Sequence, residues 1–144
     1  MGNASFTYVD RETQAQQTIL YSAAFIRAAE YTDVSPYHLA ARSRIEVGGE
    51  SASVRGTFSA DLKAAYDQLG IPYTTITTEF DGLYNFYNIG ASNSTEILGA
   101  VRNGLEYAKY GYDRTPTQTE SDNQQLIPWD DRYRSIVGLS LIHI

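Results

Sequence analysis

Residues 35–49, SPYHLAARSRIEVGG, are the segment that most constrains the fold, because both ends of a helix are marked within it. Ser35 can cap the first turn, and Pro36 suits the first helical position, where its missing N–H removes no hydrogen bond. Residues 38–46 contain good helix formers and no Pro or Gly, and Gly48-Gly49 offers the left-handed conformation that ends many helices. The sequence therefore predicts one complete helix here.

Glu46 lies in the last turn of this predicted helix, on one stripe with Leu39, Arg42 and Ser43. The negative end of the helix dipole disfavours a charged carboxylate there by roughly 0.3–1 kcal/mol. A carboxylic acid that keeps its proton suits a general acid working near neutral pH. A solvated Glu46 paired with Arg42 explains the same residue without any function, so the helix alone leaves both interpretations open.

Length and composition limit the possible partners of the chain. With 144 residues, 42% of them hydrophobic and 19% charged, it is long enough for one domain with its own core. The net charge of −6 and the absence of a basic cluster argue against binding to nucleic acid. There is no Cys, His38 and His143 form no metal-binding pattern, and no apolar run reaches the ~18 residues of a membrane span. We therefore expect no metal, no cofactor and no insertion into a membrane.

Tyrosine is the most unusual feature of the composition. The chain has 12 Tyr, together with five Phe and the single Trp129. Aromatic rings with a polar tip suit sugar-binding clefts, since the ring stacks on a pyranose and the hydroxyl hydrogen-bonds to it. Tyr also fills the rim of ordinary helical cores, so composition leaves both explanations open.

Apolar periodicity and turn residues divide the rest of the chain into predicted elements. Residues 1–9 are expected to be a loose lead-in, and Asp10 is expected to cap a long helix over residues 11–31. After Gly49 we expect a loop over 50–58, a helix over 59–69 ended by Gly70, and a strand or extended loop over 72–78. The last elements are a helix that starts at the capping-box pair Asn93 and Glu96 and ends at Gly111, a polar loop over 111–125, and a final helix capped by Asp130. Residues 10–144 are therefore predicted to form one domain of mainly α (α+β) class.

Residues 82–91, GLYNFYNIGA, fit neither a helical nor a strand period. The segment combines three aromatic residues with two amides and has Gly near both ends. Side chains of this kind can satisfy buried backbone groups in a compact turn. They can equally present hydrogen-bond donors and acceptors to a ligand, and the segment alone does not decide between these roles.

Four motifs occur in order along the chain: SPYHLAARSRIEVG, GLYNFYNIGA, NGLEYAKYGYD and PWDDRYRSIVG. Together they resemble the peptidoglycan-cleaving glucosaminidases of glycoside hydrolase family 73, the type found in Gram-positive bacterial autolysins. The usual family pattern is SPYxLAxRIRQExG, GYYNFxNIGA, GLxYA and PWxTxxxAIxGGAxFI. The resemblance covers roughly residues 20–138.

The resemblance implies a lysozyme-like helical domain with a groove for glycan strands. It implies cleavage of the β-1,4 bond after N-acetylglucosamine, with Glu46 as the catalytic acid and Tyr84 lining the cleft close to it. It further implies that Asn85, Phe86 and Asn88 of the same motif, and Trp129 of the PW pair, contact the substrate. The expected protein is a monomer that acts on peptidoglycan as part of a longer protein secreted to the cell wall.

The chain departs from the family pattern in three places. Ile45 stands where Gln usually precedes the catalytic Glu, and residues 57–79 are longer than expected between the first two motifs. An inserted helix over 57–79 would reshape one wall of the groove. GLSLIHI replaces the expected GGAxFI, so we expect a C-terminally truncated fragment.

The sequence does not identify the group that assists Glu46 in the reaction. Asp81, just before the YNF motif, is the first candidate for a second carboxylate, Glu79 is the next, and Glu50 is less suitable because it lies so near Glu46 in the chain. The 2-acetamido group of the substrate can also act as the nucleophile, with Tyr84 orienting it or steadying the oxocarbenium charge. Inverting, retaining and substrate-assisted routes are therefore all possible. A muramidase or lytic transglycosylase of the same fold, and a catalytically inactive glycan-binding module, are the alternative functions.

Overall fold

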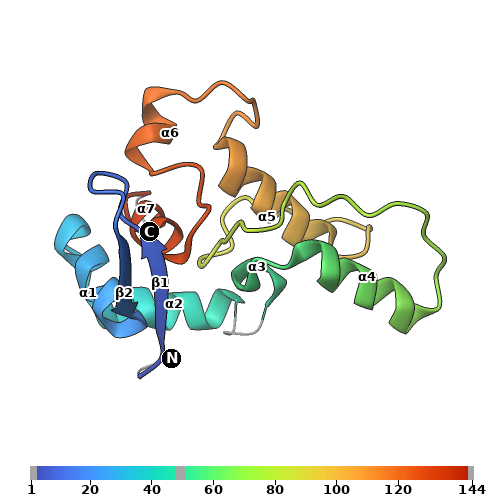
Figure 1. Ribbon diagram of the computed structural model, residues 1–144, viewed down its shortest axis with the longest axis horizontal. Coiled ribbons are helices and arrows are strands. Elements are labelled where there is room, and N and C mark those ends of the chain that lie inside the picture. Colours follow the sequence, from blue (N-terminus) through green and yellow to red (C-terminus); the bar gives the residue numbers. More distant parts are fainter. Residues whose placement is uncertain (1–2, 48–50, 143–144) are drawn as a thin grey trace.

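In the computed structural model, which describes residues 3–47 and 51–142, the chain is mainly helical with one small sheet (Figure 1). This agrees with the mainly α (α+β) class that the sequence predicts. The described elements are β1 (Ser5–Val9), β2 (Gln16–Leu20), α1 (Tyr21–Thr32), α2 (Pro36–Val47), α3 (Ala52–Arg55), α4 (Phe58–Leu69), α5 (Gly99–Tyr110), α6 (Glu120–Gln124) and α7 (Arg132–Ser140).

The N-terminal residues form a β-hairpin in place of the expected loose lead-in and the first half of the long helix. β1 and β2 pair antiparallel with Phe6 opposite Ile19, and the Phe6 side chain is buried in the core. Asp10 does act as a cap, but of the hairpin turn, because its carboxylate accepts the N–H groups two and three residues later at 2.9 and 3.1 Å. The helix prediction for residues 11–20 is wrong because residues 16–20 pair with β1 and Ile19 packs against the core from the strand, which periodicity within one segment does not reveal.

α1 follows β2 directly and packs against α2 and α7. It buries Ala24, Phe25 and Ala28, whereas Ile26 is 53% exposed. The face of α1 that packs is therefore the one with Ala24, Phe25 and Ala28, and Ile26 lies outside it.

α2 confirms the predicted central helix and its start. Pro36 is its first residue, and the carbonyl of Ser35 accepts the first helical hydrogen bond from the Leu39 N–H at 3.1 Å. Every fourth residue from Leu39 to Val47 is buried, which fixes the rotation of the helix about its axis. The glycine pair predicted to stop the helix lies outside the described residues.

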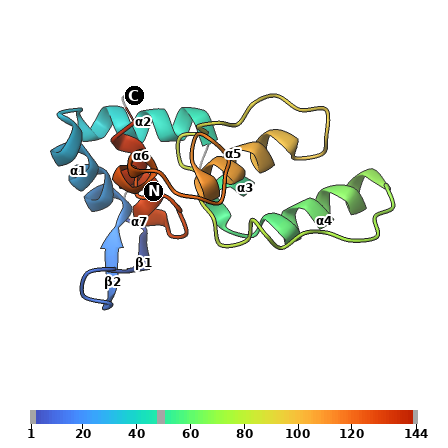
Figure 2. The ribbon, with the colours of Figure 1, turned by 90° about the horizontal axis from the view of Figure 1, so that it is seen from above.

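α4 and the extended segment after it, residues 58–79, form an arm that projects from the rest of the molecule (Figure 1 and Figure 2). Gly70 ends α4 with φ 65°, as predicted, and residues 71–78 run back without forming a strand. Phe58 is the buried residue of α4, and its ring meets that of Phe80 edge-on with 5.8 Å between centroids. Phe58 therefore anchors the base of the arm in the core.

α5 starts later than predicted and ends where predicted. The expected capping pair Asn93 and Glu96 lies in a turn, where the Glu96 N–H donates to the hydroxyl of Ser94 at 3.1 Å. Leu98 then adopts a left-handed conformation with φ 52°, which prevents the helix from extending further back. Gly111 follows the last helical residue.

The starts of α6 and α7 also differ from the prediction. α6 lies within the expected polar loop and has a capping box formed by Thr119 and Asp122. The cap of α7 is Asp131 and not Asp130, because the Asp131 carboxylate accepts the N–H of Arg134 at 2.7 Å. The predicted position was off by one residue.

The core lies where α1, α2, α5 and α7 meet the central loop of residues 82–91. Its largest members come from all of these elements and from α4. They include Phe25, Leu39, Phe58, Phe86, Tyr87, Leu105, Trp129 and Ile136. The motifs of the sequence thus converge on one core.

Candidate active site

Glu46 is exposed in the last turn of α2. Its neighbours Ser43 and Val47 are buried, and this rotation of the helix leaves Glu46 on the outer face. In Figure 1 the C-terminal end of α2 lies close to α3, and Figure 2 shows that the two differ in depth. Within the part of the chain that the structure describes, no ion pair joins Glu46 to Arg42.

The central loop of residues 82–91 is held by three consecutive backbone N–H groups, each bound to a different part of the molecule. The three hydrogen bonds run from Tyr84 to the carbonyl of Trp129 (3.0 Å), from Asn85 to the carbonyl of Ser53 (2.7 Å) and from Phe86 to the hydroxyl of Ser135 (3.1 Å). The acceptors lie just before α7, in α3 and in α7. The loop therefore braces α3 against α7 and fixes where Tyr84 stands.

The other residues of the YNF motif shape this loop. The side chain of Asn85 is fully buried: Nδ2 donates to the carbonyls of Ile89 (2.7 Å) and Gly104 (3.0 Å), and Oδ1 accepts the Ile89 N–H (3.1 Å). Phe86 is a core residue, and Asn88 adopts the left-handed φ of 58° that Asn tolerates better than most residues. Tyr84, the first residue of the motif, lines a pocket.

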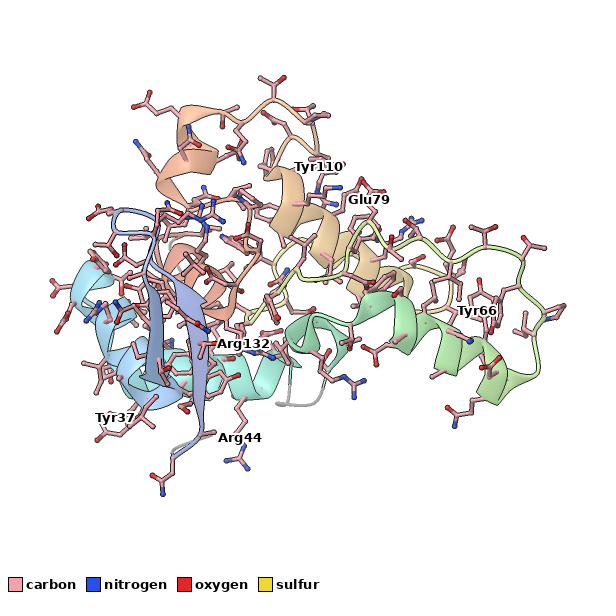
Figure 3. The ribbon with its side chains drawn as sticks, viewed as in Figure 1. Tyr37, Arg44, Tyr66, Glu79, Tyr110 and Arg132 are labelled. Atoms are coloured by element: carbon pink, nitrogen blue, oxygen red, sulfur yellow. The ribbon has the colours of Figure 1, made fainter. Side chains whose placement is uncertain are left out.

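Tyr84 lines a pocket of about 380 Å³ between the β1–β2 hairpin and the start of α7. Gly56 has φ 73°, and a Cβ on it would lie 2.5 Å from the Tyr84 hydroxyl oxygen, so only glycine suits this position. The guanidinium of Arg132 lies over the Tyr84 ring, with 4.7 Å between its Cζ and the ring centroid. Figure 3 shows Arg132 between β1 and α3 in this view.

The acidic groups at this pocket are already engaged. Asp130 forms an ion pair with Arg11 and lies 3.7 Å from Nε of Arg134. Asp131 caps α7, and burial raises the pKa of its carboxyl above the usual range. Burial also raises the pKa of the Tyr21 phenol, an effect that the nearby Arg132 guanidinium opposes.

Trp129 is fully buried and presents no ring face to a ligand. Its Nε1 donates to the carbonyl of Gln125 at 2.8 Å, and its ring lies 5.5 Å from that of Tyr107. Its backbone N–H donates to the carbonyl of Ala108 in α5 at 2.8 Å. In this structure Trp129 joins α5 to the segment before α7.

The two carboxylates considered as partners of Glu46 have structural contacts. Asp81 accepts the backbone N–H of Ser59 at 2.8 Å and its hydroxyl at 2.5 Å, at the first turn of α4. Glu79 accepts hydrogen bonds from Lys109 at 3.0 Å and from the hydroxyl of Tyr110 at 2.7 Å (Figure 3). These bonds hold the pKa of Glu79 below its usual range, with the Tyr110 bond contributing most. Glu50 lies outside the described residues.

The structure brings Tyr84 together with residues that the sequence did not single out, above all Gly56 and Arg132. Glu46, Asn88 and Trp129 are not among the residues that line the Tyr84 pocket. A signal for Arg132 was present, because it follows the PW motif at a helix start, where a cation is disfavoured. For Gly56 and the hairpin residues no local signal existed, because their contacts with Tyr84 and the pocket join distant segments.

Compared with models of protein families, with curated proteins and with solved structures, the chain matches none of them. The resemblance to family 73 therefore rests on the four motifs. Over residues 3–47 and 51–142, no cluster of three or more potential metal ligands occurs. None of the described helices is both long enough and apolar enough to cross a bilayer.

Proposed function

We propose that this chain is the catalytic domain of a peptidoglycan hydrolase with a lysozyme-like architecture. It cleaves the β-1,4 bond after N-acetylglucosamine in the glycan strand, and Glu46 is the general acid. The single observation that carries the proposal is the position of Glu46. It is exposed at the C-terminal turn of α2, whose core-facing positions are occupied by Leu39, Ser43 and Val47. Glycoside hydrolysis needs a carboxylic acid that protonates the leaving oxygen, and an exposed Glu at this position is open to a glycan strand.

The surroundings of Tyr84 support its part in the same site. Its loop is hydrogen-bonded to α3, the element that follows α2 in the chain. Tyr84 opens onto a pocket large enough for a sugar unit, and its ring is fixed by Gly56 and Arg132. In the proposal, Tyr84 orients the 2-acetamido group of the substrate or steadies the positive charge that develops at the anomeric carbon.

The contacts of Asp81 and Glu79 favour a route assisted by the substrate. Both carboxylates are bound to protein donors, Asp81 at α4 and Glu79 at α5. A carboxylate acting as nucleophile or base would have to leave those donors. The acetamido group of N-acetylglucosamine is already beside the anomeric carbon and needs no second carboxylate.

Replacement of Glu46 by Gln tests the proposal. Glu46→Gln keeps the shape of the side chain but removes the transferable proton, so release of reducing ends from purified peptidoglycan should fall by about 10²–10⁴-fold. Glu30→Gln is the matched control, since Glu30 is an exposed residue of α1. Thermal unfolding should stay close to that of the unchanged chain for both variants. A loss smaller than about tenfold, against that expected range, would show that Glu46 is not the acid.

Companion variants and product analysis separate the routes. Asp81→Asn and Glu79→Gln should each keep most of the activity if the acetamido group assists. An inactive Asp81→Asn or Glu79→Gln variant that still folds would identify a second carboxylate. Mass analysis should find N-acetylglucosamine at the new reducing ends, whereas N-acetylmuramic acid would indicate a muramidase, and binding without cleavage would indicate a glycan-binding module.

A further inference from the structure

We infer that Arg132 binds a carboxylate of the substrate in the pocket beside Tyr84. The inference rests on the proposed function, because it names the chemical group of a peptidoglycan strand that the pocket recognises. Each N-acetylmuramic acid unit carries a lactyl ether, whose carboxyl is free once the peptide has been removed. The attached peptides carry further carboxylates, so the shared chemistry is a carboxylate held close to a sugar ring.

The protein groups in contact with the Arg132 guanidinium are aromatic: the Tyr21 phenol and the Tyr84 ring. Among the described residues, no carboxylate lies within the 4.0 Å of an ion pair with Arg132. Its Nε is buried and has no hydrogen-bond acceptor there. A buried donor of a charged group without an acceptor costs stability.

The place of Arg132 in α7 adds to that cost. Arg132 is the first residue of α7, where the positive end of the helix dipole disfavours a cation. The Tyr84 ring under the guanidinium offsets part of the cost by a cation–π contact. The same contact aligns Arg132 with the pocket-lining ring that the proposed reaction uses.

The two carboxylates that line the pocket are engaged by protein groups other than Arg132. Asp130 faces two guanidinium groups, those of Arg11 and Arg134, and Asp131 is engaged as the cap of α7. Arg11 and Arg132 line the pocket together with Asp130 and Asp131, so the lining is neutral overall in a chain whose net charge is −6. Among the described residues, Arg132 is the lining cation that has no carboxylate partner.

The geometry allows one sugar unit to contact both Tyr84 and Arg132. Tyr84 and Arg132 line the same pocket, with the guanidinium over the ring. A pyranose against the Tyr84 side of the pocket would hold its ring substituents within reach of Arg132. The planar fork of a guanidinium matches the two oxygens of a carboxylate, and the resulting hydrogen bonds are charge-assisted.

Two tetrasaccharides that differ in their carboxylates provide the test. One alternates N-acetylglucosamine with N-acetylmuramic acid that has free lactyl carboxyls, and the other contains N-acetylglucosamine alone. Binding is measured by calorimetry in the full chain carrying Glu46→Gln, so that the proposed hydrolysis does not consume the ligands. We expect Arg132→Gln to weaken binding of the first by about 10- to 100-fold and to leave binding of the second unchanged.

Control variants define what the loss means. Arg102→Gln removes an arginine that is exposed on α5 and paired with Glu96, so it should change neither affinity. Arg132→Lys keeps the charge but not the fork, and should keep part of the affinity. If Arg132→Gln unfolds the chain, salt provides the second measurement, because added salt should weaken binding of the carboxylated tetrasaccharide far more than that of the neutral one.

A third ligand identifies the source of the carboxylate. In a strand that still carries its peptides, the lactyl carboxyl is an amide. If Arg132→Gln has no effect on that strand but weakens binding of the peptide-free one, the lactyl carboxylate is the partner. An equal effect on both assigns the contact to peptide carboxylates where peptides are present, and either result supports a carboxylate site at Arg132.

The inference would be overturned if the Glu46→Gln chain bound both tetrasaccharides with equal affinity. It would also be overturned if adding Arg132→Gln did not weaken binding of the carboxylated tetrasaccharide. That failure is distinct from failure of the proposed function, which is judged by cleavage with Glu46 intact. Selective binding of the carboxylated tetrasaccharide without any cleavage would overturn the proposed function and keep the role of Arg132.

Discussion

At the scale of single residues, Asn85 shows how a motif can look like a ligand contact and act in the fold. Its amide makes three hydrogen bonds to backbone groups, which joins the turn at Ile89 to α5 at Gly104. An amide is one of the few side chains that can donate twice and accept at once from a buried position. The loop around Tyr84 therefore depends on this residue for its shape.

Asn85→Ala should lower the free energy of unfolding by about 3 kcal/mol, because it leaves buried donors and acceptors without partners. Chemical denaturation followed by circular dichroism measures this change. Asn103→Ala is the control: the Asn103 amide donates to Ser92 at an exposed site, so its loss should cost much less. Equal effects of the two variants would contradict the structural role given to Asn85.

The sequence identified Tyr84 and missed the residues that hold it. Tyr84 belongs to a recognisable motif, so its importance could be predicted from the neighbouring residues in the sequence alone. Gly56 and Arg132 contact it from distant parts of the chain, and single-sequence patterns carry no information about such pairs. The burial of Trp129 could not be predicted for the same reason, since a Trp in a sugar cleft and a Trp in a core have the same sequence signal.

At the scale of elements, Asp81 caps a helix from outside its own sequence. The carboxylate accepts the N–H and the hydroxyl of Ser59 in the first turn of α4, after the chain has travelled out along the arm and back. A negative charge at this end of a helix is favourable, and it satisfies an N–H that has no partner within the helix. The base of the arm is therefore stabilised by both of its ends.

Asp81→Ala should lower the free energy of unfolding by about 1 kcal/mol and speed hydrogen exchange in α4. Asp67→Ala is the matched control, because Asp67 lies near the negative end of the same helix and its removal should be neutral or slightly stabilising. Hydrogen exchange followed by mass spectrometry would distinguish these effects. Protection of α4 that is unchanged by Asp81→Ala would contradict the capping role.

Element boundaries were predictable where one residue decides them. Pro36 starts α2, while Gly70 and Gly111 follow the ends of α4 and α5, as their conformational preferences dictate. The hairpin was not predictable, because a strand is stabilised by its partner strand and not by its own sequence. The start of α5 failed because the conformation of Leu98 overrides a capping pair with the right spacing.

At the scale of the whole molecule, the core is built from the same motifs that suggested the function. The YNF loop, the PW segment and α2 meet at its centre, and Trp129 is the largest fully buried side chain. Residues of these motifs therefore contribute to the packing of the core.

The single Trp gives a direct optical test of this packing. The indole of Trp129 is buried, so its fluorescence should be poorly quenched by acrylamide in the folded protein and should shift to longer wavelength on unfolding in urea. Addition of either tetrasaccharide should leave the emission of folded protein unchanged. An emission change at saturating glycan would instead support the direct contact with substrate that the family resemblance implies for Trp129.

The two ends of the arm meet at its base, and this has a consequence for how such a chain can vary. The N–H of Gly82 donates to the carbonyl of Gly56 at 2.9 Å, so the whole arm leaves and re-enters the body at one point. A segment attached in this way can be lengthened, shortened or exchanged without moving its points of attachment, because closing a longer loop costs little additional entropy. The length and sequence of the arm could thus change, in evolution or by design, while the core keeps its structure.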